Sequence, residues 1–231
     1  MRRFRISAVA GVFAVTAVAS ACGGGGGAGN GVASKSVSAI LAASKAAGSN
    51  AGSVKVTASA DKGGTRESYV LYEQDATHFD ENLGVVNGQR FTRLSIGSMV
   101  YLIGNEAFLK AQGASPARQR QLNDKWVAGT NPLPSAPPKL TKLMNTLLVP
   151  SGVLTKGPTS TLDGQRVVAV VDAKAGGTLY VATTGKPYPV EVVRRTSSLN
   201  STVKFSDWNQ PVKLDPPTSY QPLSLLTGAS G

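Results

Sequence analysis

Short segments in which polar and apolar residues alternate occupy both halves of this chain, and they constrain its fold more than any other feature. Alternation with a period of two is typical of β-strands with one buried face. The Asn87-Gly88 pair lies between two such segments and is a strong signal for a tight hairpin turn. Turn residues between the other segments predict antiparallel meanders. We predict strands at 54–58, 67–73, 77–85, 89–96 and 98–103 and, after a different middle region, at 152–157, 165–172, 177–183, 188–195 and 201–206.

Three other segments carry apolar residues at helical spacing. The first has Ser34 or Ser36 as its N-cap and Gly48 as its stop. A proline-rich stretch at 131–138 separates the other two, and the last has a broad apolar stripe between two prolines. We predict helices at 34–47, 105–122 and 139–148. The expected fold is α+β: one curved antiparallel sheet of about ten strands, with helices packed on one face.

The first 21 residues have the composition of an export signal. Arg2, Arg3 and Arg5 precede a largely apolar stretch at 6–18, and small residues follow it. This stretch is shorter than the roughly 20 residues that a helix needs to span a bilayer. We therefore expect a cleaved signal peptide at 1–21.

Cys22 is the only cysteine in the chain and directly follows the run Val-Ala-Ser-Ala at 18–21. The arrangement resembles a bacterial lipobox, whose cysteine receives a diacylglyceryl group and becomes the new N-terminus after cleavage. We expect Cys22 to be acylated, with palmitate among its chains, and to anchor the protein at the extracytoplasmic face of the cell membrane. The alternative is an ordinary signal peptide with an incidental cysteine. The glycine-rich residues 22–33 are expected to form a flexible tether, and 34–231 the folded domain.

The chain is basic, and this property bears on its partners. The formal charge is +11, of which the three signal arginines supply +3, so the mature chain carries +8. Such a protein is attracted to anionic head groups or to phosphate-bearing envelope polymers. The lysines and arginines are scattered, and we expect no nucleic-acid partner. We also expect a monomer.

The residue types needed for catalysis or metal binding are not grouped in the sequence. His78 is the sole histidine, and a single cysteine cannot form a disulfide within the chain. No Gly-x-Ser-x-Gly motif is present, and the adjacent Asp80 and Glu81 would point to opposite faces of a strand. Trp208 is either a sugar-stacking side chain or a plug at one end of the sheet. We expect no enzyme activity, no cofactor and no metal ion.

Four motifs in the C-terminal half are distinctive: LDGQ at 162–165, GTLYVA at 177–182, GKPYPV at 185–190 and VKFSDWNQPV at 203–212. Together with the order of elements along the mature chain, they resemble the actinobacterial lipoproteins of the LppX/LprG type. The fold of that family is similar to that of the LolA and LolB lipoprotein carriers. The resemblance implies an open half-barrel whose concave face is covered by a lid of helices. It provides no catalytic or ligand-contacting motif to carry over.

A curved sheet covered by helices either fills its concave face with side chains or leaves a cavity there. The same apolar stripes fit a filled core or a ligand wall, and both alternatives stay open. The opposite register of the strands, with Tyr69, Leu71, Met99, Tyr101 and Ile103, is nearly as apolar. The candidate lining residues are Ile40, Leu41, Phe108, Leu109, Leu143, Met144 and Leu147 on helices, and Val70, Tyr72, Val100, Leu102, Val168, Val170, Leu179 and Val181 on strands.

Together with the family resemblance, these features predict a membrane-anchored envelope lipoprotein that binds an acylated lipid or glycolipid and carries or presents it across the envelope. Each methylene group moved from water into an apolar cavity contributes about 0.8 kcal/mol, so long acyl chains would bind tightly. The expected partners are the lipid, the membrane and an envelope transporter or acceptor protein. The alternative is a non-enzymatic structural or regulatory docking module with a filled core.

Overall fold

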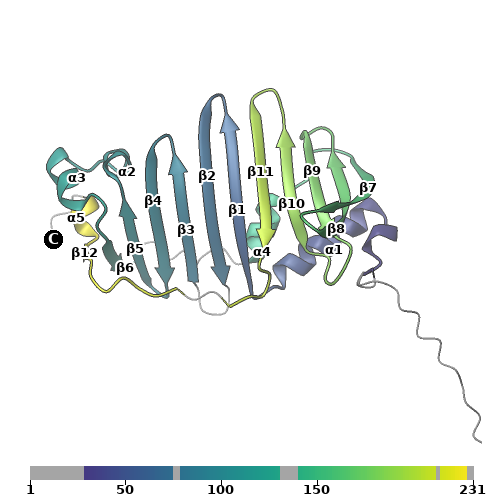
Figure 1. Cartoon of the computed structure of the whole chain (residues 1–231), viewed down its shortest axis with the longest axis horizontal. Coiled ribbons are helices and arrows are strands. Elements are labelled where there is room, and N and C mark those ends of the chain that lie inside the picture. Colours follow the sequence, from purple (N-terminus) through teal and green to yellow (C-terminus); the bar gives the residue numbers. More distant parts are fainter. Residues whose placement is uncertain (1–28, 75–78, 131–139, 212–213, 228–231) are drawn as a thin grey trace, which may run out of the picture.

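One long open sheet is the main feature of the structure, a computed structural model that describes residues 29–74, 79–130, 140–211 and 214–227 (Figure 1). In these ranges the sheet has 12 strands. They are β1 (Ser53–Lys62), β2 (Thr65–Gln74), β3 (Phe79–Val86), β4 (Gln89–Ile96), β5 (Met99–Gly104), β6 (Val127–Thr130), β7 (Leu154–Leu162), β8 (Gln165–Asp172), β9 (Gly177–Ala182), β10 (Pro189–Arg195), β11 (Leu199–Ser206) and β12 (Gln221–Pro222).

The two predicted meanders join edge to edge in this sheet. β1 pairs with β2 on one side and with β11 on the other, so the first and last long strands meet near the centre. The full order is β12-β6-β5-β4-β3-β2-β1-β11-β10-β9-β8-β7. Neighbouring strands are antiparallel except for β12 and β6, and the sheet does not close on itself.

The helices form two groups at the two ends of the sheet (Figure 1). α1 (Val37–Ser49) and α4 (Leu140–Leu147) lie at one end, preceded by the short 3-10 helix η1 (Val32–Ser34). α2 (Glu106–Ala111), α3 (Pro116–Leu122) and α5 (Ser224–Thr227) lie at the other end.

Both groups of helices cover the same face of the sheet. Val203 of β11 packs in the cluster under α1 and α4. A continuous row of directly opposed residues runs from Val203 across β1, β2, β3 and β4 to Gly104 of β5. Val203 and Gly104 therefore face the same side of the sheet. Phe108 of α2 packs over Gly104 and stacks on Phe91, with 5.0 Å between the ring centroids. The expected fold class, an α+β chain with one open antiparallel sheet and helices on one face, is confirmed.

Apolar side chains form a separate core under each helix group. The first cluster joins α1 and α4 to β1 and β8–β11, and the second joins α2, α3 and α5 to β4–β6. Full burial of an aliphatic side chain contributes about 1.5–3 kcal/mol, so each cluster is a substantial source of stability. A third cluster, around Leu94 and Tyr101, lies on the opposite face and is covered by the C-terminal segment through Leu214 and Tyr220.

The middle of the chain differs from the prediction. The single helix expected at 105–122 is two helices, because Gly113 has a left-handed backbone (φ +85°) and Ser115 caps a new helix that begins at Pro116. The strand expected at 152–157 spans Leu154–Leu162, with a shift of register between Lys156 and Thr159. The short strands β6 and β12 were not predicted.

Residues 29–33 lie on the folded domain rather than in a tether. Gly29 bridges to Thr184, and the Asn30 side chain donates to the carbonyl oxygens of Ala182 and Gly185 at 3.0 and 3.1 Å. Val32 is only 1% exposed. The tether expected at 22–33 is therefore wrong for its last five residues, which pack on the folded domain, and residues 22–28 lie outside the described part.

Candidate functional site

The close pairing of α1 and α4 forms one wall of the candidate site. α1 buries Ile40, Ser44 and Gly48, which share one stripe of the helix, and α4 buries Leu140 and Met144. A Cβ atom added at Gly48 would lie 2.4 Å from the Met144 Sδ atom. The two helices approach this closely because residue 48 has no side chain.

The sheet supplies the opposite wall. Val170 of β8, Leu179 of β9 and Val192 of β10 are directly opposed across the three strands and form an apolar row on the helix-bearing face. Two residues further along β8, the same register forms a second row of Asp172, Gly177 and Arg194. The apolar row of the sheet wall is therefore bordered by this polar row, which we call the rim of the site.

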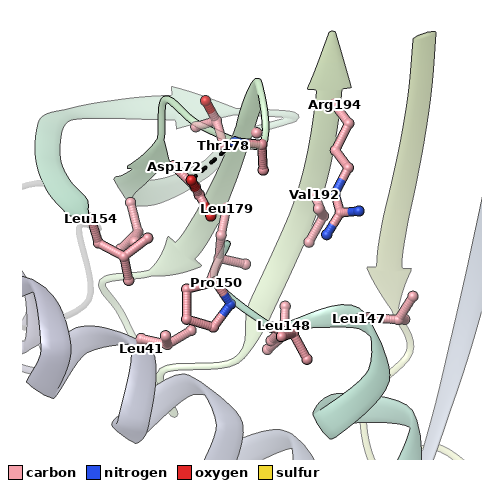
Figure 2. Close-up of a pocket in the computed structure, with 14 residues that line it drawn as sticks. Leu41, Leu147, Leu148, Pro150, Leu154, Asp172, Thr178, Leu179, Val192 and Arg194 are labelled. Atoms are coloured by element: carbon pink, nitrogen blue, oxygen red, sulfur yellow. Dashed lines mark hydrogen bonds between the residues drawn. The ribbon is translucent and has the colours of Figure 1, made fainter. Parts of the chain in front are cut away.

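A cavity of about 50 Å³ lies between these two walls (Figure 2). Typical ligand pockets measure about 300–1,000 Å³, so this one is small. Leu41 of α1 and Leu154 of β7 add to the aliphatic lining. The residues that line the cavity are Leu41, Leu147, Leu148, Val149, Pro150, Leu154, Val170, Asp172, Ala175, Gly177, Thr178, Leu179, Val192 and Arg194.

Asp172 stabilises the rim through backbone contacts. Its Oδ2 atom accepts from the Ser151 amide at 2.6 Å, and its Oδ1 atom accepts from the Ala175 amide at 3.1 Å. These amides, that of Ser151 foremost, hold the pKa of the Asp172 carboxyl below its ordinary value, although burial acts in the opposite direction. The carboxylate ties the segment after α4 to the turn between β8 and β9.

The structure brings most of the predicted lining residues together. Of these, Leu41, Leu147, Val170 and Leu179 line the cavity itself. The nine that share the cluster at α1 and α4 are Ile40, Leu41, Leu143, Met144, Leu147, Val168, Val170, Leu179 and Val181.

The remaining predicted residues lie elsewhere. Phe108, Leu109 and Leu102 belong to the second cluster, at the other end of the sheet. Val100 shares the helix-bearing face of β5 with Leu102 but lies outside both clusters on that face.

Val70 and Tyr72 lie on the face of the sheet away from the helices, so their placement on the inward face is wrong. The opposed pair on the helix-bearing face is Val56 and Leu71. β2 carries four consecutive apolar or aromatic residues at 69–72, so the pattern of that strand alone does not select a face.

Sequence reasoning missed ten of the lining residues. Val192 follows the alternation of its strand and could have been included on that basis. The loop after α4 and the polar row at the rim have no comparable signal. The missed residues are Leu148, Val149, Pro150, Leu154, Asp172, Ala175, Gly177, Thr178, Val192 and Arg194.

Trp208 packs as a plug against the core. Its ring stacks on Tyr188 with centroids 4.5 Å apart and lies 5.9 Å from that of Phe205, and its Nε1 donates to the Pro189 carbonyl.

Within the described ranges, no three Asp, Glu, His or Cys side chains gather as a metal site would require. Cys22 and His78 lie outside those ranges.

None of the helices in the described part of the chain combines the length and the apolar character needed to cross a membrane.

The chain folds as an open antiparallel sheet with helices on one face, and the solved structure of a mycobacterial protein shares this architecture. LprF from Mycobacterium bovis matches with a TM-score of 0.54 at 15% sequence identity, over 84% of this chain and 100% of that chain. The lipoprotein LppX from Mycobacterium tuberculosis matches with a TM-score of 0.49 at 17% identity, over 78% of this chain and 100% of that chain. No protein-family model and no curated protein matches the sequence. The resemblance to the LppX/LprG type is confirmed at the level of the fold.

Proposed function

We propose that this protein is a membrane-anchored lipoprotein of the cell envelope that binds an acylated lipid or glycolipid and carries or presents it. The observation that supports this most strongly is the aliphatic cavity between α1, α4 and β7–β10, in a fold shared with LprF. The role requires desolvation of acyl chains and needs no catalytic residue.

The size of the cavity has a consequence for how a lipid enters. A volume of about 50 Å³ holds only a small part of a long acyl chain. Uptake therefore requires α4 and the segment after it to move away from the sheet. The buried Met144 suits such a movement, because its unbranched side chain adapts to different surroundings.

The proposed anchor keeps the cavity near the bilayer. Cys22 lies seven residues before Gly29, the first residue fixed on the domain. Seven extended residues reach about 25 Å, so an acylated Cys22 would hold the domain within that distance of the membrane. Val149, which lines the cavity, is 52% exposed, and Val153 in the same segment after α4 is 87% exposed.

The second candidate function is a docking module with a filled core. The small cavity and the complete burial of Met144 and Val181 favour it. The two candidates predict different effects when the cavity is filled by mutation.

Leu147→Trp tests the proposal, because Leu147 lines the cavity from α4. The larger ring occupies the space of an acyl chain, and we expect affinity for a fluorescent long-chain fatty acid to fall about tenfold, which corresponds to about 1.4 kcal/mol. The melting temperature should change little. Asn145→Trp is the matched control, since Asn145 is exposed on the same helix.

The opposite results identify the docking module. If wild-type protein binds no long-chain probe at micromolar concentration, and Leu147→Trp costs about 1–3 kcal/mol of stability, the site is a filled core.

A further inference from the structure

The polar row at the rim of the cavity contains a cation that has no counter-ion among the described residues. Arg194 lies at the end of β10, and its side chain points toward the cavity (Figure 2). The residues opposed to it on the neighbouring strands are Gly177 and Ser201, neither of which carries a charge. In the part of the chain that the structure describes, no residue forms a hydrogen bond or ion pair with the guanidinium.

Asp172 is the acidic residue of the cavity, and its oxygens are already occupied. Both accept backbone amide hydrogens, from Ser151 and from Ala175. Asp172 and Arg194 flank Gly177 on the same face but form no ion pair. The Asp172 carboxylate therefore stabilises the loop and does not neutralise the charge of Arg194.

Gly177 leaves space between the two charged residues. A Cβ atom added there would meet nothing closer than 3.7 Å, and one of the atoms at that distance is Cγ of Arg194. The partly buried side chain of Arg194 lies beside this space. Its donors form a planar fork that matches a carboxylate or a phosphate.

We propose that the ligand of this cavity is an anionic amphiphile whose carboxylate or phosphate binds Arg194 while its chain packs on Val170, Leu179 and Val192. This inference rests on the proposed lipid-binding function and adds the chemistry of the head group. The apolar row and the cationic rim lie two residues apart on each strand, in the order that an acyl chain followed by a charged head requires.

The test compares two probes that share one acyl chain and differ by a phosphate group: 1-palmitoylglycerol and 1-palmitoylglycerol 3-phosphate. Palmitate serves as the carboxylate probe and inorganic phosphate as the free anion. Arg194→Gln keeps a polar, unbranched side chain, although a shorter one, and removes the charge. Arg195→Gln is the matched control, since Arg195 is the exposed neighbour and contacts Asn200.

We expect wild-type protein to prefer the phosphate probe over the neutral probe by about tenfold, which corresponds to about 1.4 kcal/mol, because the phosphate forms charged hydrogen bonds with Arg194. Arg194→Gln should abolish this preference and leave binding of the neutral probe within about twofold, and Arg194→Lys should restore part of it. Arg195→Gln should change neither value.

Three results would overturn the inference. Equal affinity of wild-type protein for the two palmitoyl probes shows that the head group is not recognised, while the lipid-binding function stands. An equal loss for both probes in Arg194→Gln shows that the arginine acts only through the packing of its stem. Inorganic phosphate binding as tightly as the phosphate probe indicates a free-anion site. Failure of every palmitoyl probe to bind rejects the proposed function itself.

Discussion

Asp172 and Arg194 lie in one row of the sheet at the rim of the cavity, but their charges are used differently. Asp172 is 8% exposed and binds two amide groups, so its charge is used within the fold. Arg194, two strands away, has a charge that no described residue uses. This contrast separates a residue that maintains the site from one that is available to a ligand.

Asp172 should make the stability of the protein depend on acid pH. Its pKa is lower in the folded protein than in the unfolded chain, where it is about 3.9. The carboxylate therefore contributes stability above that value, and the contribution is lost as the pH falls through the folded-state pKa. We expect Asp172→Asn to be less stable than wild type at pH 7, with a difference that shrinks below about pH 4.

Urea unfolding of both proteins between neutral and acid pH measures this difference. Asp207→Asn is the control, because Asp207 is an exposed carboxylate away from the cavity. A difference between wild type and Asp172→Asn that stays constant with pH would show that the charge of Asp172 plays no part.

At the scale of elements, the sequence predicts regular segments well and short ones poorly. The hairpin at Asn87-Gly88 and the strands on either side of it follow from turn chemistry and a period of two. β6 and β12 have four and two residues, too few for a period to appear. The split between α2 and α3 was readable from Gly113 and Pro116, but the helical spacing of the whole segment outweighed these signals.

The candidate site was predictable only in part for a related reason. Leu147 and Leu179 lie in long periodic segments, so their burial follows from spacing. Arg194 and Asp172 become neighbours of one cavity only through the registers of β8, β9 and β10. The pattern of residues within a single strand does not specify how that strand is paired with its neighbours. The inward face of β2 likewise depends on its pairing with β1.

Gly48 should control the contact between α1 and α4. Gly48→Leu places side-chain atoms where Met144 and Trp208 already lie, and we expect a loss of about 1–3 kcal/mol of stability from overpacking. Ala46→Leu, exposed on the same helix, should stay within about 0.5 kcal/mol of wild type. Thermal or urea unfolding measures both. Equal stabilities of the two variants would mean that α4 does not pack on α1 at this point.

At the scale of the whole molecule, one helix group packs on each end of a single open sheet. The end with α1 and α4 contains the cavity and receives the chain from the proposed membrane tether. At the other end, the C-terminal segment pairs with the edge of the sheet, where the amides of Gln221 and Leu223 donate to the carbonyl oxygens of Trp126 and Ala128. The proposed lipid site and Gly29, the first described residue after the proposed anchor, therefore lie in the same half of the molecule.

Cys22→Ala should release the protein from the membrane. Two or three acyl chains hold a protein stably on a bilayer, and without the thiol none can be attached at this position. We expect the variant to be soluble after processing or to remain as an uncleaved precursor, as shown by detergent phase partitioning and by the mass of its N-terminus. A variant that still partitions into detergent with an acylated N-terminus of mature size would contradict the anchor.

The most direct test of lipid binding is mass spectrometry of the organic extract from this protein purified from its own host. The Cys22→Ala variant should be used, since it carries no covalent lipid that could be mistaken for cargo. The proposed lipid binding predicts a long-chain lipid in near-stoichiometric amount, enriched in anionic head groups and reduced by Leu147→Trp. An extract without lipid, from protein that also binds no long-chain probe, would contradict it.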